Sequence, residues 1–119
     1  MKYKMICFDI DGTLLDDNKH IQLQVKESLH RASEQGIQIA LSTGRMPAGA
    51  ELIEQELGID LSETIAFGDQ ELDIPMVEIA GLGIAMGNAI PELKAVADFV
   101  TKSNNEAGIA YALEQYLRP

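Results

Sequence analysis

Two aspartates, Asp9 and Asp11, stand immediately after a short apolar run near the start of the chain, and Gly12 follows them. On an extended backbone, residues two apart point to the same face. Both carboxylates are therefore expected to lean into one crevice at the end of a strand. Two like charges about 4 Å apart repel by roughly 4 kcal/mol at an effective dielectric constant near 20. A cation, a shared proton or full exposure to water must compensate for this repulsion.

Two further stretches carry oxygen-bearing side chains suited to the same chemistry. Ser42 and Thr43 follow a second apolar run, and Asp69 follows a third, with Asp73 four residues later. Hard oxygen ligands of this kind suit Mg²⁺, which often pairs one or two carboxylates with a phosphate. A carboxylate can also attack phosphorus, giving an aspartyl-phosphate that water then cleaves. Small hydroxyls and backbone amides can hold the phosphate oxygens. The pattern indicates magnesium-assisted phosphoryl chemistry.

Apolar runs that alternate with helical patterns must position these groups. Strands are predicted at residues 5–8, 37–41, 64–67, 82–86 and 99–101, and helices at 21–35, 48–57, 72–80, 91–97 and 107–117. Such alternation indicates a parallel sheet with right-handed crossovers. If the helix before the third strand passes back over the first, the strand order is 2-1-3-4-5. The first and third strands then flank the point where such sheets bind ligands. We expect an α/β, Rossmann-like three-layer sandwich with the acids on one rim.

The composition is typical of a soluble globular domain, with 119 residues of which 46% are apolar and 24% charged. We expect one domain over residues 1–119. Its apolar runs are too short to span a bilayer, and its start lacks a signal-peptide pattern. The lone Cys7 excludes an internal disulfide, which fits a reducing compartment. A net charge of −10 argues against a nucleic-acid partner. The chain is therefore expected to be cytoplasmic, without membrane or nucleic-acid partners.

Four motifs extend this pattern over nearly the whole chain. They are Phe-Asp-Ile-Asp-Gly-Thr-Leu-Leu (8–15), Ser-Thr-Gly-Arg (42–45), Phe-Gly-Asp (67–69) and Gly-Ile-Ala-Met-Gly-Asn-Ala (83–89). Together they resemble the haloacid dehalogenase superfamily, and more narrowly its Cof-type, sugar-phosphatase-like branch. The resemblance implies a phosphatase acting on a small phosphorylated metabolite.

The resemblance also implies catalytic and phosphate-binding roles for particular residues. It makes Asp9 the nucleophile and Asp11 the general acid/base. Thr43 becomes the phosphate-binding hydroxyl, and Gly44 and Gly12 contribute to the same phosphate site.

The same resemblance implies a Mg²⁺ site. Its ligands are Asp9, Asp69 and Asp73, together with Asp11 through its carbonyl. The cofactor expected for the chain is therefore Mg²⁺.

Three departures from the family pattern bear on activity. Members of this branch usually carry a large cap domain after the Thr-Gly-Arg segment, where this chain has only residues 47–63. The family's phosphate-neutralising lysine has no counterpart, since no lysine lies between Lys26 and Lys94. Lys102 is the candidate substitute. Leu72 stands where the family usually has asparagine.

These departures leave more than one interpretation open. The leading one is a capless phosphatase with weak turnover, which the resemblance to other capless members implies will self-associate. A second is a catalytically impaired relative that serves as a metal-binding or protein-interaction module. A third is a receiver-like domain of the response-regulator type, in which Asp69 rather than Asp9 accepts the phosphoryl group. The Asp-x-Asp-Gly-Thr motif speaks against this third interpretation.

Overall fold

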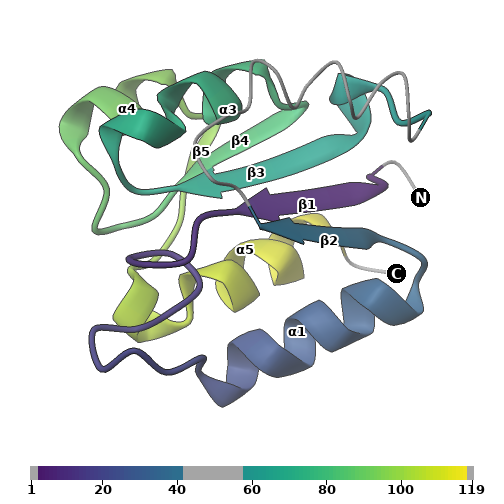
Figure 1. Ribbon diagram of the computed structural model, residues 1–119, viewed down its shortest axis with the longest axis horizontal. Helices are drawn as coiled ribbons and strands as arrows, with labels where there is room; N and C mark the ends of the chain where they lie inside the picture. The colour runs from purple at the N-terminus through teal and green to yellow at the C-terminus, as the bar shows by residue number, and fades with distance from the viewer. Residues whose placement is uncertain (1–2, 42–57, 118–119) are drawn as a thin grey trace.

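Five parallel strands form one sheet in the described part of the chain, residues 3–41 and 58–117 of a computed structural model. They are β1 (Met5–Phe8), β2 (Gln38–Leu41), β3 (Thr64–Gly68), β4 (Leu82–Ala85) and β5 (Phe99–Val100). The strand order is β2-β1-β3-β4-β5, as the sequence predicts. The chain adds β2 on one side of β1 and β3 on the other (Figure 1). The carboxyl ends of β1 and β3 therefore flank the expected ligand-binding point.

Helices cover both faces of this sheet, which confirms the predicted three-layer α/β architecture (Figure 1). One face carries α1 (Leu23–Glu34) and α5 (Gly108–Tyr116), and the other carries α3 (Ile74–Ile79) and α4 (Pro91–Val96). Short 3₁₀ helices span Leu61–Glu63, Glu71–Asp73 and Asn104–Glu106. Within the described ranges, no helix has the length and apolar character that crossing a bilayer requires.

The predicted elements agree with the observed ones to within about two residues at most ends. The predicted helix at 48–57 lies outside the described residues. Residues 42–63 make up the whole connection between β2 and β3. The chain therefore carries no cap domain between these two strands, as expected.

The central strands supply apolar side chains to both layers. The side of the sheet facing α1 and α5 buries Ile6, Phe8, Ile65, Phe67 and Ile84 together with Val25, Ala32, Ile109 and Leu113. The opposite side buries Met5, Cys7, Ala66 and Met76. This alternation follows from the two-residue period of a strand. Each large side chain buried in this way contributes about 1.5–3 kcal/mol, so the core holds the strand ends at fixed positions.

Two expectations about burial are wrong. The apolar run at residues 37–41 predicts a second buried strand, but Ile39 and Leu41 are 38% and 55% exposed. The reason is that, among the described strands, β2 lies at the end of the sheet and pairs with β1 alone. One continuous helix over residues 72–80 predicts Leu72 in phase with the apolar residues Met76, Ile79 and Ala80, but Leu72 is 73% exposed. Residues 71–73 form a 3₁₀ helix before α3, and its tighter winding changes which residues face inward.

Candidate active site

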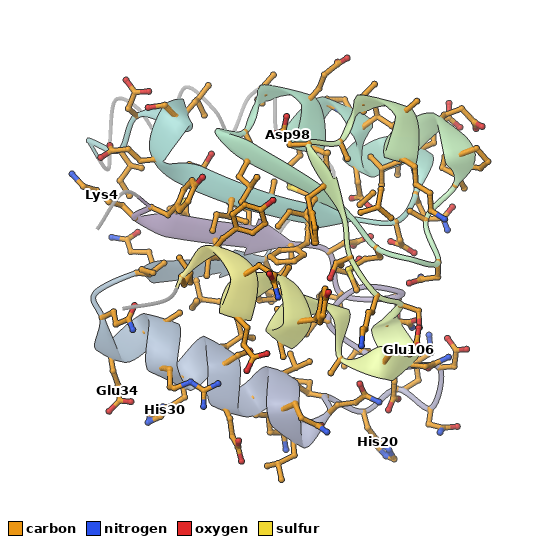
Figure 2. All side chains as sticks on the ribbon, turned by 180° about the vertical axis from the view of Figure 1, so that it is seen from behind. Lys4, His20, His30, Glu34, Asp98 and Glu106 are labelled. Atoms are coloured by element: carbon orange, nitrogen blue, oxygen red, sulfur yellow. The ribbon has the colours of Figure 1, made fainter. Side chains whose placement is uncertain are left out.

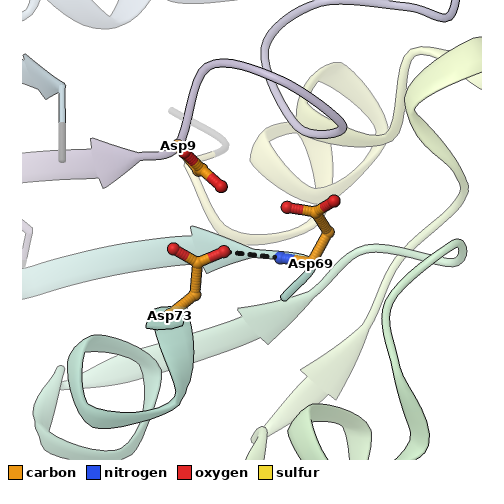
Figure 3. Close-up of side chains that lie close together, drawn as sticks. All are labelled: Asp9, Asp69 and Asp73. Atoms are coloured by element: carbon orange, nitrogen blue, oxygen red, sulfur yellow. Dashed lines mark hydrogen bonds between the residues drawn. The ribbon is translucent and has the colours of Figure 1, made fainter. Parts of the chain in front are cut away.

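Three carboxylates meet at the carboxyl ends of β1 and β3. Asp9 directly follows β1, Asp69 directly follows β3, and Asp73 is the last residue of the 3₁₀ helix Glu71–Asp73. One oxygen from each lies within 4.8 Å of the other two (Figure 3). Phe8 of β1 pairs with Phe67 of β3, so the residues just beyond the two strands are neighbours. The structure thus brings together three of the four acids that the sequence singles out.

Hydrogen bonds from nearby backbone and side chains fix two of these carboxylates. Asp69 and Asp73 are 4% and 3% exposed. The Asp73 Oδ2 atom accepts the backbone N–H groups of Asp69 at 3.0 Å (Figure 3) and of Gln70 at 3.2 Å. Asp69 Oδ1 accepts the hydroxyl of Thr13 at 3.3 Å. Asp9 is half-buried and accepts the N–H of Ile10 at 2.9 Å.

The electrostatic environment of the cluster disfavours negative charge. Burial raises the pKa values of Asp9, Asp69 and Asp73 above the usual range for aspartate, and charge repulsion within the cluster adds to each increase. In the described residues, none of the three forms an ion pair with a basic side chain.

The ion pairs that do occur in the described ranges lie on the surface. His30 and Glu34 pair on the outer side of α1 (Figure 2), and Lys4 pairs with Glu63. Neither pair involves a residue of the carboxylate cluster. The cluster therefore offers closely spaced oxygen ligands, and these ion pairs do not compensate its negative charge. A hard divalent cation such as Mg²⁺ fits such a set of ligands.

Asp11 occupies a different position from the one expected. It lines the same hollow of about 420 Å³ as Asp9, Asp69 and Asp73. Its carboxylate, however, is exposed and pairs with Lys19 Nζ at 2.9 Å. The expectation assumed an extended backbone through Asp11, whereas β1 ends at Phe8 and a turn follows. Asp11 therefore lines the hollow without joining the carboxylate cluster.

The residues expected to bind phosphate are only partly described. Gly12 lines the hollow and has a φ of +78°, and a Cβ at this position would meet the carboxylate of Asp69. Thr43 and Gly44 lie outside the described residues. Lys102, the candidate replacement for the missing lysine, lies 4.7 Å from the centre of the Tyr111 ring and lines a separate hollow beside α1 and α5. Lys102 therefore does not take the predicted position.

Sequence reasoning missed two polar residues that support the cluster. Thr13 is 2% exposed and bonds Asp69, and Asn88 donates to the carbonyl of Gly12 at 2.9 Å. Both lie inside motifs that carry the family resemblance, and that is the signal by which they could have been found.

Comparison with known proteins relates most of the chain to one family. A family model described as haloacid dehalogenase-like hydrolase matches residues 6–61 and 48–113. The stress response protein YhaX of Bacillus subtilis is 44% identical over 88 residues, which cover 74% of this chain and 31% of YhaX. The 5-amino-6-(5-phospho-D-ribitylamino)uracil phosphatase YwtE of Bacillus subtilis is 39% identical over 117 residues, or 97% of this chain and 41% of YwtE. The chain thus spans well under half the length of these two relatives.

The fold also resembles that of solved structures. A 3-deoxy-D-manno-octulosonate 8-phosphate phosphatase from Moraxella catarrhalis, solved with a magnesium ion, a phosphate ion and a KDO molecule, has a TM-score of 0.85 to this chain. The alignment covers 98% of this chain and 86% of that chain at 23% identity. At this identity the likeness concerns the fold.

Proposed function

Because this chain belongs to the haloacid dehalogenase-like hydrolase family, we propose that it is a magnesium-dependent phosphohydrolase acting on small phosphomonoesters. The observation that carries the proposal is the close approach of Asp9, Asp69 and Asp73. The name of YwtE, a phosphatase of a small phosphorylated metabolite, supports the substrate class. Family membership also sets aside the receiver-like interpretation.

The proposed metal ligands are the three clustered carboxylates together with the carbonyl of Asp11. All are oxygen atoms, and the two buried carboxylates are held in place by hydrogen bonds from their surroundings. When bound, Mg²⁺ would offset most of the negative charge of the cluster and polarise a phosphoryl oxygen.

In the proposed reaction, a carboxylate oxygen of Asp9 attacks phosphorus and the alcohol leaves with a proton from Asp11. Water then cleaves the aspartyl-phosphate, with Asp11 accepting its proton. For this role Asp11 must leave its ion pair with Lys19, in which the two side chains are 73% and 68% exposed. Exposed pairs are weak, so this rearrangement is easy. Thr43, Gly44 and Gly12 are the proposed phosphate contacts.

One observation favours slow turnover or a pseudoenzyme. In the described part of the chain, the hollow is lined by acids, Gly12, Gln70 and Leu72, without a lysine or arginine. A dianionic phosphate would therefore meet acids without the neutralising charge that the family pattern provides.

The test of the proposed function is phosphate release from an activated aryl phosphate and a panel of small phosphomonoesters, with Mg²⁺ and with EDTA. Hydrolysis that depends on Mg²⁺ supports the phosphatase, and magnesium binding without turnover supports the pseudoenzyme. Self-association stays a prediction, to be checked by light scattering.

The substitution Asp73→Asn is expected to stabilise the metal-free protein at neutral pH. A carboxyl whose pKa is higher in the folded chain than in the unfolded chain holds its proton more tightly when folded. Its contribution to the free energy of unfolding therefore falls as pH rises from 3.8 through the raised pKa. Asparagine keeps an oxygen for the backbone bonds from Asp69 and Gln70 and removes the charge. In EDTA at pH 7.5 we expect a melting temperature about 4 °C higher than wild type, with a smaller difference near pH 4.

Magnesium supplies the control for this experiment. At a hundredfold excess over its dissociation constant, a ligand that binds the native state alone stabilises by about 2.7 kcal/mol. Mg²⁺ should therefore raise the melting temperature of wild type and of Glu71→Gln, which removes an exposed acid beside the cluster. It should raise that of Asp73→Asn much less. A lower melting temperature for Asp73→Asn in EDTA at neutral pH would contradict the repulsion argument.

The substitution Leu72→Asn is expected to tighten magnesium binding about tenfold. Leu72 lines the hollow and is 73% exposed, so its removal creates no core cavity. An amide oxygen there adds a hard ligand or an outer-shell partner, and such partners are typically worth about 10–100-fold in metal affinity. The measurement is calorimetric titration with MgCl₂. Leu23→Asn is the matched control, because Leu23 is 66% exposed and does not line the hollow. Equal affinity in all three proteins would reject the prediction.

A further inference from the structure

The turn after β4 contacts both loops that carry the acidic cluster. Asn88 Nδ2 donates to the carbonyl of Gly12 at 2.9 Å. Two residues later, the backbone N–H of Ile90 donates to the carbonyl of Asp69 at 3.0 Å. One short segment therefore bonds to the loop after β1 and to the loop after β3.

The bond from Asn88 holds the peptide that lies against Asp69. The carbonyl of Gly12 belongs to the peptide bond between Gly12 and Thr13. On one side of this peptide, the α-carbon of Gly12 packs so closely on the Asp69 carboxylate that a Cβ would clash with it. On the other side, the Thr13 hydroxyl donates to Asp69 Oδ1. A shift of this peptide must therefore move the carboxylate of Asp69 or break its hydrogen bond.

A second hydrogen bond fixes the orientation of the Asn88 amide. Its Oδ1 atom accepts the backbone N–H of Asn104 at 3.0 Å. Rotating the amide by 180° would face its oxygen toward the Gly12 carbonyl and its NH₂ group toward another N–H donor. Asn104 is itself buried and donates to the carbonyl of Leu15 and to Asp17. The bond from Asn104 thus fixes the Asn88 amide so that its Nδ2 group points at the carbonyl of Gly12.

We propose that Asn88 is a positioning residue for the metal site. It fixes the Gly12–Thr13 peptide against Asp69 and so keeps the carboxylates of Asp9, Asp69 and Asp73 at the spacing that a divalent cation needs. This inference rests on the proposed function. Asn88 does not line the hollow, and in this proposal it acts through Thr13 and Asp69.

The substitution Asn88→Ala tests this role by calorimetric titration with MgCl₂. We expect the dissociation constant for Mg²⁺ to rise about tenfold, since outer-shell partners of metal ligands typically contribute about 10–100-fold. Phosphate release should fall by a similar factor at limiting Mg²⁺ and recover in part at saturating Mg²⁺. The matched control is Asn18→Ala, an exposed asparagine whose backbone N–H rather than its side chain makes the local hydrogen bond. It should behave as wild type.

Asn88→Asp provides a second variant that keeps an acceptor for the N–H of Asn104. It loses the donor to Gly12 and adds a negative charge. A simple charge effect would tighten Mg²⁺ binding, whereas loss of positioning weakens it. A double-mutant cycle with Thr13→Val tests whether Asn88 influences Mg²⁺ affinity through the contact between Thr13 and Asp69. If Asn88 acts through the Thr13–Asp69 contact, Asn88→Ala should weaken Mg²⁺ binding less than threefold in the Thr13→Val background.

The outcomes separate this inference from the proposed function. If wild type binds Mg²⁺ and Asn88→Ala and Asn88→Asp bind it equally well, the positioning role is rejected and the phosphatase proposal stands. The same conclusion holds if both variants bind Mg²⁺ as wild type does but melt at a lower temperature in EDTA. A loss of thermal stability without a loss of Mg²⁺ affinity indicates a purely structural role. If wild type itself binds no Mg²⁺, both proposals fail together. Weaker binding by both variants with an unchanged Asn18→Ala control supports the inference.

Discussion

Replacing Asp9 by asparagine is expected to abolish magnesium-dependent phosphate release, with a loss of about 10⁴-fold or more. An amide oxygen does not attack phosphorus as a carboxylate does, so the aspartyl-phosphate cannot form. Asp9 is also the one member of the cluster at the end of β1, and it lines the hollow together with Asp11. The measurement is release of phosphate from an activated aryl phosphate at saturating Mg²⁺, with wild type and variant purified identically.

The control for Asp9→Asn is Glu71→Gln, which removes a negative charge near the hollow without altering its lining. It should retain activity within about twofold. Incubation with a reactive small phosphodonor gives an independent test, because wild type should be labelled at Asp9 and Asp9→Asn should not. An unchanged hydrolysis rate in Asp9→Asn would mean that the activity belongs to a contaminant. The pseudoenzyme interpretation would then be favoured.

The central part of the fold could be predicted from sequence because local and long-range preferences agree there. The run Met5–Phe8 is apolar at every position and is buried on both faces of the sheet. β3 and β4 are likewise buried at every position, and Thr64 is the one polar residue of these two strands. Once these strands are parallel, their carboxyl ends must share one rim, and this brings Asp9 near Asp69. The strand order follows from the crossover rules rather than from any single residue.

The details of the site could not be predicted, because they depend on backbone geometry that periodicity does not encode. Treating residues 9–11 as extended places Asp11 beside Asp9, whereas the turn after β1 directs Asp11 to Lys19. Treating residues 72–80 as one helix places Leu72 in the core, whereas the 3₁₀ turn exposes it. The bond from Asn88 to Gly12 joins residues 76 positions apart, and no local pattern predicts such a contact.

At Gly12, the backbone conformation directly affects the position of a site residue. Its φ of +78° lies in the left-handed region, and its α-carbon packs on the carboxylate of Asp69. Alanine at this position therefore has two separate costs. One is the backbone strain of a left-handed residue with a Cβ, about 1–2 kcal/mol. The other is the displacement of the Asp69 carboxylate, which must shift relative to Asp9 and Asp73 or break its bond with Thr13.

A second glycine allows the two costs to be measured separately. Gly36, after α1, has a φ of +87°, and a Cβ added there meets nothing within 4 Å. Gly36→Ala should therefore show the strain alone, as a lower melting temperature with Mg²⁺ affinity and phosphate release near wild type. Gly12→Ala should show the same strain and lose phosphate release by about 100-fold or more, since a misplacement of about 1 Å at a reacting centre costs that much. Its Mg²⁺ affinity should fall as well. Equal activity in the two variants would show that the contact between Gly12 and Asp69 does not set the geometry of the site.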